Sequence, residues 1–105
     1  MFVILWEFEV KPGRENRFES AYGAKGAWVA LFAQDPAYHG TQFFREVERP
    51  RVYLTRDTWL SRAAYEEFRL KHRAEYAKLD AECAALKQAE RRVGFFETEE
   101  GAADP

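Results

Sequence analysis

The sequence predicts a small α+β fold in which helices cover one face of a four-stranded antiparallel sheet. Three observations predict it: an N-terminal run with the two-residue period of a strand, two β-branched and aromatic runs joined by a short connection, and a long segment of helical period. A last apolar run follows that segment. The element order is therefore β-α-β-β-α-β, the split βαβ arrangement of a ferredoxin-like sheet.

The first strand is expected over residues 2–10, which alternate between two faces. A Lys-Pro-Gly turn at residues 11–13 ends it, because proline cannot donate to a β-ladder and glycine permits a turn. Residues 14–22 follow a helical period, and residues 27–33 are expected to form a second helical piece. This strand and these helices make up the first half of the pattern.

The second half is a hairpin, a long helix and a last strand. Strands are expected over 41–48 and 52–60, and their short connection predicts an antiparallel hairpin. Ser61 is the expected N-cap of a helix over 62–87, and a fourth strand is expected over 91–97. The apolar stripe of the helix recurs every three or four residues, at Tyr65, Phe68, His72, Tyr76, Leu79, Cys83 and Leu86.

One domain is expected over residues 1–97, because 105 residues is the length of a single domain. The acidic, small-residue tail over 98–105 is expected to be disordered. Helices on one face leave the other face of the sheet uncovered. We therefore expect a second copy of the chain to cover it, forming a homodimer through the sheet faces.

Composition and charge argue against several partners. The formal net charge is −2 with interleaved signs, which offers no footprint for nucleic acid. The apolar run over residues 2–6 has no basic leader and is too short to span a bilayer, so no signal peptide and no membrane partner are expected. The single cysteine, Cys83, forms no intrachain disulfide, and we expect a cytoplasmic protein.

Several motifs occur in a fixed order along the chain. They are Glu9-Val-Lys-Pro-Gly13, Phe18-Glu-x-x-Tyr22, Trp28-x-x-Leu-Phe32, Tyr38-x-Gly-Thr41, Tyr53-Leu-Thr-x-Asp57-x-Trp-x-Ser61 and Tyr65-x-x-Phe68. Together they resemble the antibiotic biosynthesis monooxygenase (ABM) superfamily, the dimeric α/β-barrel group, over roughly residues 2–97. The Trp-x-Ser and the Gly-Thr are the more specific parts, and none of the motifs is a catalytic signature.

The resemblance implies a homodimer whose two sheets form a barrel, with one pocket per subunit between sheet and helices. It leaves the activity open, because the group includes cofactor-free oxygenases of quinols and anthrones, haem-degrading enzymes, and enzymes that act on small signalling molecules. Haem-degrading members resemble one another in a first-strand asparagine and in a helical tryptophan and histidine. Here the first strand has no asparagine, and Phe68 and Lys78 stand at the other two positions, so haem degradation is not expected.

His72 is the candidate catalytic base, because it lies on the apolar stripe of the long helix between Phe68 and Tyr76. A half-buried imidazole can take or give a proton near neutral pH. Glu75 or Tyr76, one turn further on, would hold its second nitrogen. The alternative is a histidine that packs in the core or at an interface with its hydrogen bonds satisfied.

The candidate substrate-binding residues are mostly aromatic. A flat phenolic compound would stack on them, with tyrosine hydroxyls and indole N–H groups directed at its oxygens. Each of them alone also suits ordinary core packing, and Arg45 would hold a phenolate only if it points inward. The set is Trp6, Tyr22, Trp28, Phe32, Arg45, Tyr65, Phe68 and Tyr76.

These residues suit a monooxygenase that needs no cofactor and uses O₂ on a small aromatic or quinol-like compound. Once deprotonated, such a compound passes an electron to O₂ directly, so the protein has to bind it, take its proton and stabilise the oxyanion. No metal site is expected, because His72 and Cys83 lie about 16 Å apart along the helix. Two rivals stay open: a non-enzymatic ligand-binding or stress-response module, and an isomerase or lyase acting on a small carbonyl compound.

Overall fold

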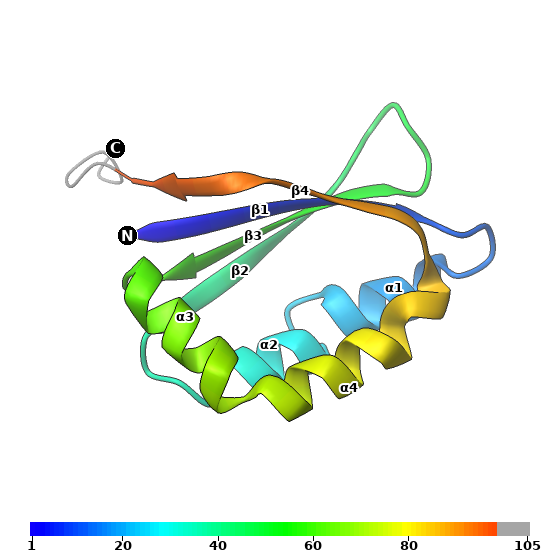
Figure 1. The fold of residues 1–105 in the computed structure, drawn as a ribbon. Coiled ribbons are helices and arrows are strands. Elements are labelled where there is room, and N and C mark those ends of the chain that lie inside the picture. Colours follow the sequence, from blue (N-terminus) through cyan, green and yellow to red (C-terminus); the bar gives the residue numbers. More distant parts are fainter. Residues whose placement is uncertain (99–105) are drawn as a thin grey trace.

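The computed structural model describes residues 1–98. They form one four-stranded antiparallel sheet in the order β2-β3-β1-β4, with the described helices on one face (Figure 1). The strands are β1 Phe2–Val10, β2 Tyr38–Arg45, β3 Val52–Trp59 and β4 Lys87–Glu97. The helices are α1 Glu15–Tyr22, α2 Ala27–Phe32, α3 Arg62–Lys71 and α4 Arg73–Cys83, followed by a 3₁₀ turn at Ala84–Leu86. The predicted α+β, ferredoxin-like class is confirmed.

The expected disordered tail falls almost wholly on residues 99–105, which lie outside the described residues. Thr98, the last described residue, donates its backbone N–H to the carbonyl of Met1 at 2.9 Å. None of the described helices is long and apolar enough to cross a bilayer.

Strand β1 lies at the centre of the sheet and pairs antiparallel with both β3 and β4. In this register Phe8 lies opposite Tyr53, and Ile4 lies opposite Asp57. Alternation alone does not show which face of β3 points toward the helices. The structure settles the question: Tyr53, Asp57 and Trp59 are on the helix-covered side and buried, together with Ile4 and Phe8 of β1.

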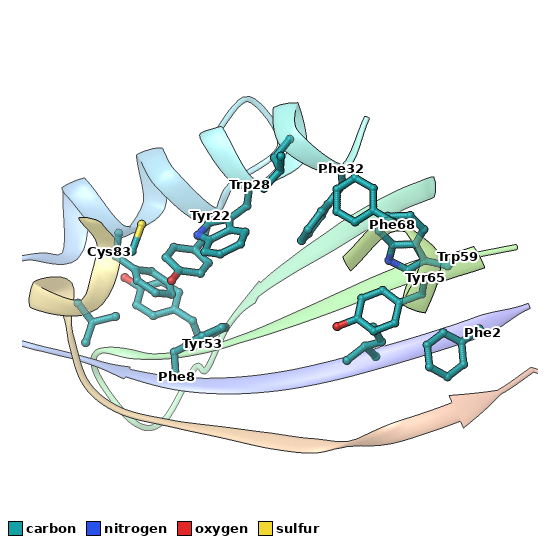
Figure 2. Close-up of a cluster of buried hydrophobic side chains, with 14 residues drawn as sticks. Phe2, Phe8, Tyr22, Trp28, Phe32, Tyr53, Trp59, Tyr65, Phe68 and Cys83 are labelled. Atoms are coloured by element: carbon teal, nitrogen blue, oxygen red, sulfur yellow. The ribbon is translucent and has the colours of Figure 1, made fainter. Parts of the chain in front are cut away.

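The core between sheet and helices is built mainly of aromatic rings (Figure 2). Phe18 and Tyr22 of α1 stack with 4.3 Å between ring centroids, and Phe32 of α2 meets Trp59 of β3 edge-on at 5.6 Å. Phe18 and Trp59 are fully buried. Contacts of this kind hold the two short helices over the sheet, because each buried ring removes a large apolar area from water.

The expected continuous helix over 62–87 is wrong. It is interrupted at His72, whose φ of −108° and ψ of 28° are not helical, so the segment divides into α3 and α4. The two helices point in different directions (Figure 1), and α4 turns across α2. There Tyr76 meets Trp28 edge-on with 4.9 Å between ring centroids. This tertiary contact outweighs the regular helical period of the segment.

Three boundaries of β2 and β4 also differ from expectation. β4 begins at Lys87 instead of residue 91, because Lys87 already pairs with Val10 at the end of β1. β2 begins at Tyr38 instead of residue 41, because Tyr38 already lies opposite Trp59, and it ends at Arg45 instead of residue 48. Pairing with a neighbouring strand therefore sets both starts.

No described element covers the second face of the sheet (Figure 1). Phe44 of β2 and Phe96 of β4 are 43% and 45% exposed on that face. Leu5 and Leu54, which share the face by alternation, are half-buried. A single chain thus presents an apolar sheet surface to its surroundings.

Candidate functional site

A cavity of about 50 Å³ lies between the sheet and the helices. Its walls are largely aromatic, and its polar groups are of three kinds: unpaired donors, a buried carboxyl and a charged rim. The lining residues are Trp6, Phe8, Thr55 and Asp57 of β1 and β3, Tyr22, Trp28, Phe32, Tyr76 and Asp80 of the helices, and Lys87 and Glu90 of β4.

Two of the polar groups are hydrogen-bond donors without partners. The hydroxyl of Tyr22 and the indole Nε1 of Trp28 are buried, and neither has a hydrogen-bond partner among the described residues. Burial raises the pKa of the Tyr22 hydroxyl and the neighbouring Trp28 indole N–H lowers it; burial has the larger effect, so the hydroxyl stays protonated. An unpaired buried donor costs about 1–3 kcal/mol, so an oxygen atom of a ligand would be bound favourably here.

The joint between α1 and α2 brings these two donors together. Tyr22 ends α1, Trp28 lies in the first turn of α2, and their rings are 5.8 Å apart between centroids. Gly26 makes the joint possible, because a Cβ at this position would lie 2.2 Å from the carbonyl oxygen of Ala21. The chain thus needs glycine here to place a tyrosine and a tryptophan on one wall.

Asp57 is the buried carboxyl of the cavity and is 8% exposed. Its Oδ1 accepts a hydrogen bond from the hydroxyl of Thr41 at 2.5 Å, and Thr41 in turn contacts the hydroxyl of Tyr38. Burial raises the pKa of Asp57 to about 6, and the Thr41 hydrogen bond opposes this rise. A carboxyl with this pKa can exchange a proton near neutral pH.

Lys87 and two carboxylates form the charged rim. The Lys87 side chain is 6% exposed, and its ammonium group pairs with Glu90 at 3.1 Å and with Asp80 at 3.8 Å. The ammonium lies 5.7 Å from the ring centroid of Phe8 and 5.6 Å from that of Tyr22. Because Asp80 belongs to α4 and Lys87 to β4, the pair of Lys87 with Asp80 joins α4 to β4 beside the cavity.

Five of the eight expected binding residues line this cavity, and three do not. Arg45 lies at the surface, where its guanidinium pairs with Glu19 at 2.7 Å. Tyr65 and Phe68 are buried against Trp59 in another part of the core. The five that the fold brings together are Trp6, Tyr22, Trp28, Phe32 and Tyr76.

His72, the expected catalytic base, is not among the cavity-lining residues. Its side chain is half-buried at the junction of α3 and α4, and its ring stacks on Phe68 with 4.5 Å between centroids. The expected partner is present, since Nδ1 lies 2.7 Å from Oε1 of Glu75. The surroundings of His72 are thus those of a hydrogen-bonded histidine beside the core.

A comparison with protein-family models matches residues 1–78 to the family described as antibiotic biosynthesis monooxygenase. The chain belongs to the ABM family. The matched segment runs from β1 into α4 and contains every cavity-lining residue except three, Asp80, Lys87 and Glu90. Those three form the charged rim.

Solved structures share the fold of this ABM chain. SnoaB, a cofactor-independent oxygenase from Streptomyces nogalater, matches with a TM-score of 0.76 at 18% identity, over 93% of this chain and 92% of that chain. A Bordetella bronchiseptica protein named as an antibiotic biosynthesis monooxygenase matches with a TM-score of 0.74 at 20% identity, over 93% and 96%. A mutant of MhuD, with two manganese protoporphyrin IX bound per active site, matches with a TM-score of 0.70 at 18% identity, over 93% and 94%. A search of curated proteins gave no match.

A porphyrin does not fit the residues of this ABM chain. Neither His39 nor His72 lines the cavity. Phe68 is fully buried in the core, and Lys78 is exposed on α4. Within the described residues, no group of three His, Cys, Asp or Glu side chains is placed to hold a metal ion.

Sequence reasoning missed five polar or charged residues of the site: Thr55, Asp57, Asp80, Lys87 and Glu90. One signal was present, because Asp57 alternates in phase with Tyr53 and Trp59, two large aromatic residues. For Lys87 there was no signal, since the residue was assigned to the end of a helix. The fold thus assembles an aromatic cavity with two unpaired hydrogen-bond donors, Tyr22 and Trp28, on one wall and the titratable carboxyl of Asp57 on another.

Proposed function

We propose that this ABM protein is a cofactor-independent monooxygenase that oxidises a small aromatic or quinol-like compound. The observation that carries the proposal is the pair of buried, unpaired donors, Tyr22 and Trp28, in an otherwise aromatic cavity. An oxygen of a phenol or ketone is the acceptor that would satisfy both. SnoaB, which shares the fold, is a cofactor-independent oxygenase.

Substrate entry requires side chains of the cavity to move. The cavity of about 50 Å³ is smaller than the ~150 Å³ cavity that accommodates one benzene ring. Trp6 and Tyr76 are the half-buried aromatic residues of the lining, so an outward movement of either would open the cavity to solvent. The flat rings that remain, Phe8, Trp28 and Phe32, then provide stacking surfaces for a planar ligand.

The proposed reaction balances without a cofactor. A base takes one proton from a ring CH₂ or hydroxyl, and the resulting carbanion or phenolate transfers one electron to O₂. The substrate radical and superoxide then combine to form a C–O bond and a peroxide anion. Return of the proton gives a hydroperoxide, which loses water and leaves a ketone, so that CH₂ and O₂ become C=O and H₂O.

The two donors stabilise the charge that develops on the substrate oxygen after deprotonation. Both are positioned before the reaction and lie in a region shielded from water, where a hydrogen bond to an oxyanion is strongest. Excluding water also prevents superoxide from leaving before it combines with the substrate radical. The aromatic walls therefore serve both binding and chemistry.

The proposal is tested by oxygen consumption with a panel of hydroquinols, anthrones and naphthols, without added cofactor and with a chelator present. We expect uptake above the rate of autoxidation with at least one compound, and a product heavier by one oxygen and lighter by two hydrogens. Binding of a panel compound without uptake would support the ligand-binding module. Conversion without oxygen consumption would support an isomerase or lyase.

A variant of one donor tests the site itself. Tyr22→Phe removes one hydroxyl and is expected to lower kcat by about 10²-fold, the usual cost of losing one oxyanion donor. Tyr53→Phe is the matched control, because Tyr53 is equally buried but donates to Glu19 and does not line the cavity. Equal rates for the two variants would contradict the assignment of Tyr22.

We also propose that the protein acts as a homodimer in the cytoplasm. The apolar face that carries Phe44 and Phe96 supports a second copy as its cover, because two such faces can bury each other. The single cysteine fits a reducing compartment.

A further inference from the structure

We infer that Asp57, held in place by Thr41 and Tyr38, is the catalytic residue that takes the substrate proton. The inference rests on the proposed function, since it assigns the base that the reaction needs. It replaces His72 in that role with a residue that lies in the cavity.

The first argument is position. Asp57 lies on the inward side of β3 between two other inward residues, Thr55 and Trp59, and it lines the same cavity as Tyr22 and Trp28. One carboxyl oxygen is bound by Thr41. The other has no hydrogen-bond partner among the described residues. It is not fully buried, and Asp57 is a lining residue of the cavity. A base needs one free oxygen directed at the proton that it removes.

The second argument is the direction of the hydrogen-bond chain. The Thr41 hydroxyl has one proton, and it donates that proton to Asp57. The contact between Tyr38 and Thr41 therefore has Tyr38 as donor. The chain Tyr38 to Thr41 to Asp57 fixes the rotation of the carboxyl group, which makes Thr41 and Tyr38 positioning residues. The bond from Thr41 to Asp57 joins β2 to β3, whose register places Thr41 directly opposite Asp57.

The third argument is the charge around Asp57. From β2 it faces the hydroxyls of Thr41 and Tyr38, and from α4 it faces Tyr76. The charged residues that share the cavity, Asp80, Lys87 and Glu90, pair with one another at the rim and leave a net charge of −1 there. The β1 residue opposite Asp57 is apolar, and the two α2 residues of the lining carry no charge.

No cation therefore holds Asp57 in its ionised form, so its pKa is raised by burial to about 6. At pH 7 about nine molecules in ten carry the ionised base, which is far more basic than an exposed aspartate. The same carboxyl, once protonated, can return its proton to the peroxide anion. One residue thus serves the two proton transfers of the proposed reaction.

The decisive comparison uses Asp57→Asn and His72→Ala with the best compound of the oxygen-uptake panel. Asparagine keeps the size of the side chain and can still accept from Thr41, but it cannot take the proton. We expect kcat/KM to fall about 10²-fold or more in Asp57→Asn, with a dissociation constant for the compound unchanged within about threefold. Glu67→Gln, an exposed carboxylate on α3, is the control for the change of charge. A loss in His72→Ala that equals or exceeds the loss in Asp57→Asn would overturn the inference.

Thr41→Val and Thr41→Ser test the positioning role through the pH profile. Valine removes the hydrogen bond that opposes the rise in pKa, so the acidic limb of kcat/KM should move to higher pH. Serine restores the hydroxyl and should restore the profile. A Thr41→Val profile identical to that of the unchanged protein would contradict the role of Thr41.

A readout that needs no turnover separates the inference from the proposed function. The Asp57 carboxyl resonance is followed by ¹³C NMR, assigned by its loss in Asp57→Asn, while 2-naphthol is added. We expect this resonance to titrate near pH 6 and to shift when 2-naphthol binds, even if no panel compound is oxidised. Binding that moves aromatic resonances of Trp28 but leaves Asp57 unchanged would overturn the inference, whatever the outcome of the uptake assay.

Discussion

At the scale of single residues, burying the ionised carboxylate of Asp57 costs free energy of folding, and its neighbours do not fully compensate for this cost. A carboxyl that is 8% exposed and has no cation beside it is held in a place where its ionised form is poorly solvated. The hydroxyl of Thr41 compensates for only part of this. Costs of this kind are typical of functional sites, where stability is given up for chemistry.

The cost predicts how stability depends on pH. The pKa of Asp57 is about 6 in the folded protein against a model value of 3.8, so the folded state binds this proton more tightly than the unfolded state. The protonated Asp57 carboxyl therefore contributes to the free energy of unfolding. This contribution is fully present below about pH 4, declines as the pH rises toward 6, and is then lost. The loss amounts to about 3 kcal/mol at most.

Asp57→Asn removes this dependence, because an amide does not ionise. We expect the variant to be more stable than the unchanged protein at pH 8, by about 1–3 kcal/mol, and nearly equal to it at pH 4. Urea unfolding at the two pH values measures the difference, with Glu67→Gln as an exposed control. A variant that is less stable at pH 8 would show that the carboxylate is better solvated than its burial indicates.

At the scale of elements, the short helices α1 and α2 place the two donors, and the break at His72 places α4. The joint between α1 and α2 tolerates only glycine at residue 26, and the break brings Tyr76 against Trp28. The sequence predicts the joint, since it indicates separate helical pieces over 14–22 and 27–33, but the break at His72 has no strong local signal. Both are set by how closely the helices approach each other over the sheet.

Gly26→Ala tests the importance of the α1–α2 joint. The added methyl group would lie 2.2 Å from a backbone oxygen, so the joint has to open, and we expect a loss of about 2–4 kcal/mol in unfolding free energy. Gly13→Ala is the contrast. Nothing lies within 4 Å of its added methyl, and only its φ of +81° opposes alanine, so about 1 kcal/mol is expected. Chemical denaturation of both variants checks the order.

At the scale of the whole molecule, the uncovered face of the sheet predicts self-association. Light scattering at micromolar concentration should give about twice the chain mass of 12.3 kDa. Phe96→Glu places a charge on this face and should shift the protein toward the monomer, because an unpaired charge is costly to bury. Leu70→Glu, on α3 and 72% exposed, is the control and should leave the mass unchanged. A monomer in the unchanged protein would contradict the dimer.

Much of the fold could be predicted because it depends on local patterns. The alternation of β1, the hairpin of β2 and β3 and the cap of α3 are all properties of short segments. The N-cap is confirmed by the bond from the Ala64 N–H to the Ser61 hydroxyl at 3.1 Å. The aromatic part of the cavity was predictable for the same reason, since residues such as Trp28 and Tyr76 lie on the apolar stripes of their helices.

The polar residues of the cavity are set by tertiary contacts and not by local sequence patterns. Both faces of β3 carry apolar residues, so alternation did not say whether Asp57 or Leu54 points inward, and the pairing with β1 decided it. The same holds for His72. Its place on the helical stripe predicted a position in the site, but the helix breaks at this residue and His72 does not line the cavity. Most elements and their apolar faces follow from local period and are therefore predictable from the sequence, with the helix over 62–87 as the exception. The site depends on burial and on contacts between distant segments, which exist only once the chain has folded.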